Sequence, residues 1–292
     1  IDTPDNTGNI IVDRPLSGSG ASLTNLPAAN LTGTIVGARL PDPLPAISGA
    51  SLTNLPAGGD TRNFIIDGDF TQWPEGTSAT AFIAGFPYHY GSALLQNRLT
   101  SAGTFTWERS TDVPTVAQSG HNSKYSILYK CTGTDTSIAS NDYVAAMYYM
   151  TGSDFAYIHQ QQVTISFWTK TSAANSGHIY YLSLNNSAGN RSYVTSFTPT
   201  SSWTKITKTI TLDTSGTWNF DEASSSLIIN FGLVAGTDYQ VTADQWAANW
   251  DLAGSNISNF GDDTGNEFYI SQFSLVLGSS APSSFLGESI ST

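Results

Sequence analysis

The 34 aromatic residues of this 292-residue chain (7 Trp, 13 Tyr and 14 Phe) are confined to one part of it. The first of them is Phe64, whereas residues 1–60 contain seven of the twelve prolines and no aromatic side chain. A segment that lacks aromatic residues and is interrupted by Pro and Gly cannot bury enough apolar surface to build its own core. The chain is therefore expected to divide into a non-globular segment, residues 1–60, and a globular domain, residues 61–292.

The non-globular segment contains the phrase GASLTNLPA twice, at residues 20–28 and again at residues 49–57. Two copies are too few for a solenoid, which needs several stacked units to bury a shared core. Aliphatic residues recur at short, uneven spacings, among them Leu23, Leu26, Leu52 and Leu55. A flexible linker would be richer in Ser, Gly and charge. Two interpretations stay open, and an extended, intertwined oligomeric stalk is favoured over a disordered linker.

The composition excludes several classes of partner. Only 12% of the residues are charged, and the formal net charge is −12. Such a surface repels nucleic-acid phosphates and anionic membranes, so binding to DNA, RNA or a membrane surface is not expected. The sequence has no run of about 20 apolar residues, so membrane insertion is not expected either.

From Asn63 onward the sequence predicts an all-β domain. Apolar residues alternate with polar or small ones in four stretches between turns rich in Gly, Asn, Ser and Asp, a pattern typical of antiparallel strands with one buried face. The stretches are KYSILYKC (124–131), QQVTISFWTK (161–170), WTKITKTITL (203–212) and LIINFGL (227–233). About ten such strands in one domain predict an antiparallel β-sandwich of the jelly-roll type.

Two other stretches depart from simple alternation. The last strand, EFYISQFSLVL (267–277), is apolar on both faces. It is therefore expected to be central and covered on both sides, or kinked by a β-bulge near Ser271. The stretch ADQWAANWDL (243–252) is the only helix-like one, and it can equally be a loop.

Four phrases of the domain, in this order, resemble a family. They are NFIIDGDFTQWPEGT (63–77), VTISFWTK (163–170), SSWTKITKTITL (201–212) and TGNEFYISQFSLVLG (264–278). Together they resemble a carbohydrate-binding-module-like jelly-roll domain found at the distal ends of phage tail fibres, and GASLTNLPA and NLTGT resemble repeats of the fibre shafts. The resemblance implies a homotrimeric virion fibre protein that contacts other tail or baseplate proteins and adheres to glycan on the host surface. The chain ends in GESIST, whereas such fibres often carry a longer tail rich in Tyr and charge.

No catalytic motif supports an enzyme. GxSxG, HExxH, P-loop and CxxC patterns are absent, and His89, His121, His159 and His178 show no metal-ligand spacing. The single cysteine, Cys131, lies at the end of an expected strand, where a structural thiol is the simplest interpretation. The chain is therefore expected to be a binding protein without enzymatic activity.

No cofactor is required, but one metal site is a candidate. Jelly-roll domains of this kind often hold a structural Ca²⁺ where the first and last strands meet, and Ca²⁺ prefers oxygen ligands. Asp67 and Asp69 lie in the first phrase, and Glu267 begins the last strand. The alternative is that Asp-Gly-Asp forms a turn in which Asp caps its own backbone. The position where such domains often place an Asp is occupied by Ser271 and Gln272.

Candidate glycan-binding residues are aromatic side chains in loops. A sugar presents C–H faces and hydroxyl edges, which fit an exposed aromatic ring beside amide and carboxylate groups. Trp218, Trp246 and Trp250 lie in loop-like stretches rich in such groups, and Tyr88, His89 and Tyr90 form another aromatic loop. The alternative is that each Trp pins its loop to the sandwich.

The other tryptophans are expected to have structural roles. Trp168 and Trp203 fall in expected strands and are predicted to lie in the core, and Trp73 is predicted to pack at the base of the domain.

Three functions remain possible at this stage. The first is a receptor-binding tail fibre on the outside of the virion. The second is a structural head fibre or capsid decoration protein with the same architecture. The third is a free-standing secreted carbohydrate-binding module, which leaves the duplicated phrase of residues 1–60 without a purpose.

Overall fold

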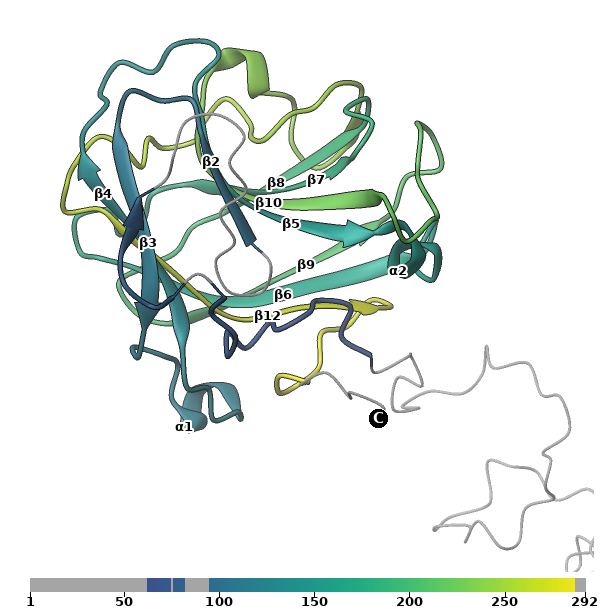
Figure 1. Cartoon of the computed structure of the whole chain (residues 1–292), viewed down its shortest axis with the longest axis horizontal. Coiled ribbons are helices and arrows are strands. Elements are labelled where there is room, and N and C mark those ends of the chain that lie inside the picture. Colours follow the sequence, from purple (N-terminus) through teal and green to yellow (C-terminus); the bar gives the residue numbers. More distant parts are fainter. Residues whose placement is uncertain (1–61, 75, 82–94, 287–292) are drawn as a thin grey trace, which may run out of the picture. The chain divides into compact units, whose positions relative to one another are not determined.

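The computed structural model describes residues 62–74, 76–81 and 95–286, except for the side chains of residues 96–99. The chain divides into two units, residues 1–55 and 56–292. The first unit lies outside the described residues, so the stalk predicted for residues 1–60 stays a prediction. Within the second unit two antiparallel sheets pack face to face (Figure 1), which confirms the predicted all-β sandwich.

Within the described residues each sheet contains six strands, and neighbouring strands run antiparallel. The first sheet has the order β1 (Thr80–Ala81), β3 (Thr104–Ser110), β4 (Ser126–Gly133), β12 (Glu267–Leu277), β6 (Gln162–Thr171) and β9 (Thr204–Thr211). The second has the order β11 (Trp246–Ala247), β8 (Ser192–Phe197), β7 (Tyr180–Asn186), β10 (Ser225–Ala235), β5 (Tyr143–Thr151) and β2 (Leu95–Leu99). The described helices are short: α1 (Val116–Ser119), α2 (Gly152–Ala156) and the 3-10 turn η6 (Thr237–Tyr239).

The core lies between the two sheets and is built by alternate residues of each strand. Val163, Ile165 and Phe167 of β6 point inward, as the alternation of the sequence predicts. Phe167 lies edge-on to Phe231 of β10, with ring centroids 5.0 Å apart. Cys131 is buried in the same core, and burial raises the pKa of its thiol to about 11. The thiol is therefore part of the packing and stays protonated at neutral pH.

The outer face of the second sheet is also covered. Ile228 of β10, Ala145 and Met147 of β5, and Leu252 and Ala253 of the later loop form a second, smaller apolar cluster. The segment that follows β10, residues 236–259, supplies this cover. The stretch 243–252 within it forms the short strand β11 and bends, so the loop interpretation holds and no long helix forms there.

Strand β12 is central and bulged, as its doubly apolar pattern predicts. It pairs with β4 on one side and with β6 on the other. The register with β6 shifts between Ser271 and Ser274, and Gln272 adopts a positive φ of 51°. The bulge therefore lies one residue from the predicted position and re-aims the side chains that follow it.

The leading segment of the domain, residues 62–74, attaches to this bulge. The N–H of Phe64 donates to the carbonyl of Leu275 (2.9 Å), and the N–H of Phe273 donates to the carbonyl of Gly68 (2.8 Å). The buried Asn63 side chain accepts from the N–H of Ile65 and of Leu275, both at 3.0 Å. The phrase NFIIDGDF thus pairs with backbone groups of β12 at the bulge and beyond Ile270, where the ladder with β4 ends.

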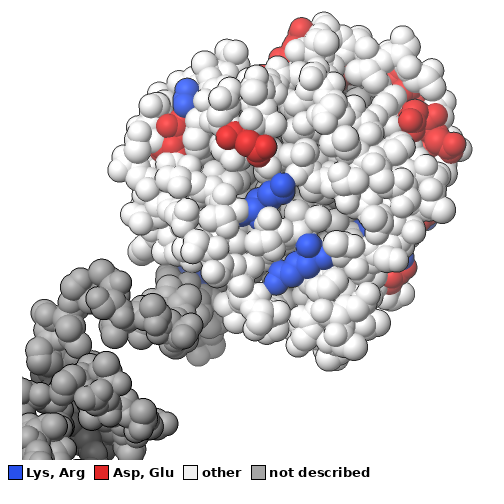
Figure 2. Space-filling view, turned by 180° about the vertical axis from the view of Figure 1, so that it is seen from behind, with Lys and Arg blue, Asp and Glu red and all other residues white. Residues whose placement is uncertain are grey.

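The described surface carries few charges. Figure 2 shows one face on which uncharged residues dominate, with a few separate acidic and basic side chains. In the described part of the chain no helix is both long and apolar enough to cross a membrane.

Gly68 should not tolerate a side chain. A Cβ atom at this position would lie 1.9 Å from the carbonyl oxygen of Phe273, which is fixed backbone. We expect Gly68→Ala to lower the free energy of unfolding by about 3 kcal/mol or more, because the leading segment must move away from β12. Chemical denaturation of the full chain measures this.

Gly189→Ala is the matched control. Gly189 has open space around it and a φ of 70°, so this change adds only the left-handed strain of about 1–2 kcal/mol. Equal losses in the two variants would contradict the close contact between Gly68 and Phe273.

Candidate functional site

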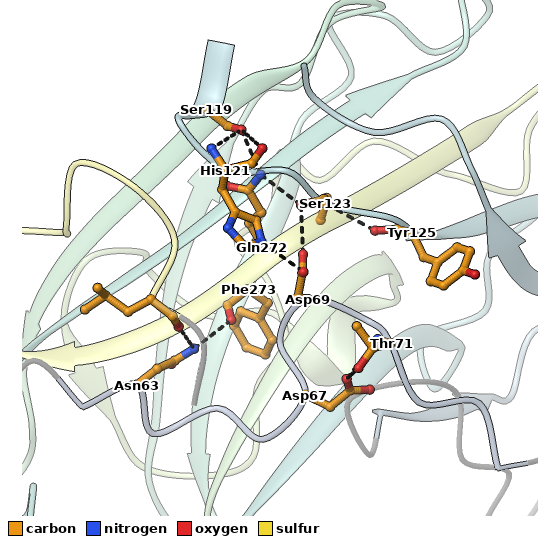
Figure 3. Close-up of polar contacts among 12 residues, drawn as sticks. Asn63, Asp67, Asp69, Thr71, Ser119, His121, Ser123, Tyr125, Gln272 and Phe273 are labelled. Carbon is orange, nitrogen blue, oxygen red and sulfur yellow. Dashed lines mark hydrogen bonds and ion pairs between the residues drawn. The ribbon is translucent and has the colours of Figure 1, made fainter. Parts of the chain in front are cut away.

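The carboxylate of Asp67 caps the turn that follows it in the chain. One oxygen accepts from the N–H (2.8 Å) and the hydroxyl (2.7 Å) of Thr71, and the other accepts from the N–H of Gln72 (3.0 Å). Figure 3 shows Asp67 and Thr71 facing each other within the leading segment. This geometry is the capping turn that the sequence offered as the alternative to a metal ligand.

The carboxylate of Asp69 joins three parts of the domain. It contacts Nε2 of His121 (2.9 Å) and accepts from the Ser123 hydroxyl (2.7 Å), both in the loop after α1. Gln272, at the bulge of β12, donates to the hydroxyls of Ser119 (2.9 Å) and Ser123 (3.0 Å) (Figure 3). His121 and Ser123 bond the same carboxylate, so the histidine does not stand between acid and hydroxyl as in a catalytic triad.

The third predicted metal ligand, Glu267, lies elsewhere. It accepts from the hydroxyl of Tyr269 (2.8 Å) at the beginning of β12. Phe273, which contacts Gly68, is six residues further along the strand, or about 20 Å at roughly 3.3 Å per residue. Asp67, Asp69 and Glu267 therefore do not converge. Among all described residues no three His, Cys, Asp or Glu side chains gather in a group that could hold a metal ion.

Two of the predicted glycan residues, Trp218 and Trp246, meet each other, with ring centroids 6.1 Å apart. Trp218 is only 9% exposed and stacks on Phe155 of α2 at 4.7 Å. The indole N–H of Trp218 donates to the carbonyl of Ser215 (2.8 Å), and that of Trp246 donates to the carbonyl of Thr211 (2.9 Å). Both side chains fasten loops to the sandwich, which matches the structural alternative stated for them.

Trp250 differs from both. Its half-buried ring lies edge-on to Tyr143 and to Tyr239, each with centroids 5.7 Å away, and these two tyrosines lie 5.0 Å apart. Its indole N–H makes no hydrogen bond within the described residues. We call these three residues the Trp250 cluster. It combines a partly accessible aromatic surface with an unused hydrogen-bond donor, the pair of features that a sugar ring requires.

Buried polar residues fix the backbone next to the cluster. Asp251 accepts from the Ser192 hydroxyl (2.8 Å), and its carbonyl accepts from the Asn185 amide (3.0 Å). Asn230 in turn donates to Asn185 (2.7 Å), while its own Oδ1 is buried and has no partner. Burial raises the pKa of Asp251, and the Ser192 hydrogen bond partly offsets this. The segment that carries Trp250 is therefore held to the sheet at defined points.

Three tryptophans and one loop remain from the sequence predictions. Trp168 and Trp203, predicted to be in the core, are half-buried on the outward side of their sheet, and the Trp203 N–H donates to Asp112 (2.9 Å). The alternation that buries Phe167 turns Trp168 outward, which corrects that prediction. Trp73 stacks on Trp107 with centroids 6.1 Å apart. The loop of Tyr88, His89 and Tyr90 lies outside the described residues.

Sequence reasoning missed four accessible aromatic residues. Tyr143 and Tyr239 complete the Trp250 cluster, but no signal in the sequence places these distant positions together. Phe220 and Tyr157 are 50% and 67% exposed on the surface near α2. A charged neighbourhood could have indicated them, since NFDE surrounds Phe220 and Asp154 precedes Tyr157.

Comparison with known proteins gives only distant similarities. No family model matches the chain, and no curated protein matches its sequence. Among solved structures it is similar to a family 11 carbohydrate-binding module from Clostridium thermocellum, bound to a β-1,3-1,4-mixed-linked tetrasaccharide. The identity is 14%, the match covers 70% of this chain and 98% of the module, and the TM-score is 0.38.

Two further structures give similar values. The CBM22-1 xylan-binding domain of Paenibacillus barcinonensis Xyn10C has 11% identity and a TM-score of 0.35, with 76% of this chain and 97% of that chain covered. The enzymatically active domain of bacteriophage CBA120 tailspike protein 4 has 11% identity and a TM-score of 0.35 over 62% of this chain. The match spans only 19% of the tailspike chain.

The raised pKa of Asp251 predicts a pH-dependent effect on stability. A carboxyl whose folded pKa lies above its unfolded value costs stability when it is ionised, and the cost disappears as pH falls through the folded pKa. We expect Asp251→Asn, whose amide oxygen still accepts from Ser192, to raise the Tm at pH 7 by on the order of 2 °C. Thermal unfolding of both proteins between pH 7 and pH 4 should show this difference narrowing. A lower Tm for the variant at pH 7 would contradict the prediction.

Proposed function

We propose that this chain is a homotrimeric virion fibre protein whose β-sandwich binds glycan on the host-cell surface. The Trp250 cluster carries the glycan part of the proposal. Its half-buried ring, flanked by two tyrosines, offers a face for sugar C–H groups, and its unbonded indole N–H is ready to donate to a hydroxyl. The site acts by binding, and we assign it no catalytic step.

The polar residues beneath the cluster support the same proposal. Sugar binding is weakened when a platform must be ordered at the moment of binding, because side-chain and loop entropy is then lost. Asp251 and Asn185 anchor the backbone beside Trp250 before any ligand arrives. An aromatic face that is ordered before binding is therefore available on a chain in which only 12% of the residues are charged.

The fibre part of the proposal is supported by residues 1–60. Their duplicated phrase and spaced aliphatic residues suit association with other copies, and the phrase NFIIDGDF resembles the opening of distal fibre domains. Three sandwiches on one stalk would bind a dense glycan surface with an avidity well above that of one weak site. Attachment to tail or baseplate proteins, an extracellular location on the virion and the jelly-roll assignment belong to this proposal.

Removal of the Trp250 ring should weaken adhesion. We expect Trp250→Ala to weaken binding of the full chain to host cells about thirtyfold or more, since truncation of a central Trp costs about 2 kcal/mol or more. Flow cytometry with labelled protein measures this.

Trp203→Ala is the matched control, because Trp203 is also half-buried but packs against Tyr269 of the other sheet. Both variants should keep the wild-type circular dichroism spectrum. Equal binding by wild type and Trp250→Ala would refute the assigned site, and failure of free protein to block infection would favour a head fibre or decoration protein.

The native mass of the full chain tests the assembly. We expect three subunits of 31.1 kDa each, because the proposed stalk needs other copies of the chain to bury the aliphatic residues of residues 1–60. Sedimentation equilibrium at several concentrations gives the mass and the dissociation constant. A monomer at all concentrations would refute the fibre proposal and favour a free-standing binding module.

A further inference from the structure

A hollow of about 230 Å³ lies beside the turn that carries Tyr239. Its polar lining consists of Ser140, Thr237, Gln240, Ser258 and Asn259, and its apolar lining comes mainly from isoleucine and valine. None of the lining residues carries a charge. The volume is below the roughly 300–1,000 Å³ of pockets for drug-sized ligands, but it equals the space of several waters at about 30 Å³ each.

The hollow is already formed by close backbone contacts. The N–H of Gly236 donates to the carbonyl of Asp142 (2.7 Å), and the N–H of Asp238 donates to the carbonyl of Ser140 (2.8 Å). A Cβ at Gly236 would lie 2.1 Å from the carbonyl oxygen of Ala139, so the turn is pressed against this neighbouring loop. The walls therefore require no rearrangement before a ligand enters.

Several polar groups of the lining are held in place while keeping hydrogen-bonding capacity. Gln240 donates from Nε2 to the carbonyl of Ala235 (2.7 Å), which leaves its Oε1 as an acceptor among the described residues. The Ser258 oxygen accepts from the N–H of Ile179 (2.9 Å), so its O–H can still donate. The Thr237 hydroxyl makes no hydrogen bond within the described part of the chain. Donors and acceptors of this kind match the hydroxyl groups of a sugar.

The hollow and the Trp250 cluster share one structural element. Tyr239 of the cluster stands between Thr237 and Gln240 of the lining, and Ala235 of the lining pairs with Tyr143 of the cluster. Both features are therefore attached to the turn of residues 236–240. An oligosaccharide that occupied both would pass over this turn.

We propose that the hollow is a second subsite, which takes one uncharged sugar residue of a glycan whose neighbouring part packs on the Trp250 cluster. This inference rests on the proposed function and names its ligand class. One charged side chain is bonded to the lining, the acidic Asp238, which accepts from the Ser140 hydroxyl (2.9 Å). Since no cation lines the hollow, a uronic acid or sialic acid would lose its hydration without gaining a counter-charge.

The experiment uses saturation-transfer NMR on the full chain. The probes are glucose, galactose, mannose and N-acetylglucosamine as neutral sugars, and glucuronate and N-acetylneuraminate as acidic sugars. Thr237→Trp fills the hollow, and Thr242→Trp, at an exposed position of the same segment, is the matched control. We expect at least one neutral sugar to bind wild type and control, and to bind Thr237→Trp about tenfold more weakly, which corresponds to about 1.4 kcal/mol.

Three results would overturn the subsite. They are no signal from any neutral sugar, equal signals for Thr237→Trp and wild type, and equally strong signals from the acidic sugars.

Host-cell binding distinguishes failure of the subsite from failure of the proposed function. If Trp250→Ala loses cell binding while Thr237→Trp keeps it and sugar signals do not change, only the subsite falls. If neutral sugars bind the hollow but wild type does not bind cells, only adhesion falls.

Discussion

The attachment of the leading segment to β12 is the interaction on which the rest of the domain depends. β12 is central in its sheet, and its bulge interrupts the regular ladder with β6. The ladder of β12 with β4 ends at Ile270, so the backbone groups beyond it need other partners, and each would cost about 1–3 kcal/mol if left unsatisfied. Asn63 and the backbone of Phe64 and Gly68 supply those partners, and Asp69 then links the same segment to His121 and Ser123.

The covered outer face of the second sheet decides where an accessible aromatic group can lie. Because residues 236–259 cross this face and bury Ile228 beneath Leu252 and Ala253, the sheet itself offers no open surface there. The partly accessible rings near this face belong to the Trp250 cluster, in which Trp250 contacts Tyr143 and Tyr239. The same crossing brings the turn of residues 236–240 against the loop of residues 138–140 and so creates the adjoining hollow.

The sandwich was predictable because strand periodicity is local information. Alternation in residues 163–167 and 227–233 indicated strands, and its loss in residues 267–277 indicated a central strand with a bulge. The alternation predicts one buried face, whereas β10 is buried on both faces because a later segment covers Ile228. The site was less accessible to prediction. Whether a tryptophan is pinned or available depends on a distant carbonyl, such as that of Thr211 for Trp246. Trp168 was misplaced because it follows a buried Phe167, and strong β-propensity does not tell which sheet face a residue occupies.

The bond between Asn63 and the carbonyl of Leu286 (3.4 Å) places the two ends of the described domain side by side. A domain whose two ends lie close together can be inserted into another chain at one point without disturbing its interior. Recombination between genes could then exchange the whole sandwich as one unit. The contact between Asn63 and Leu286 would thereby also mark the boundary of an exchangeable unit.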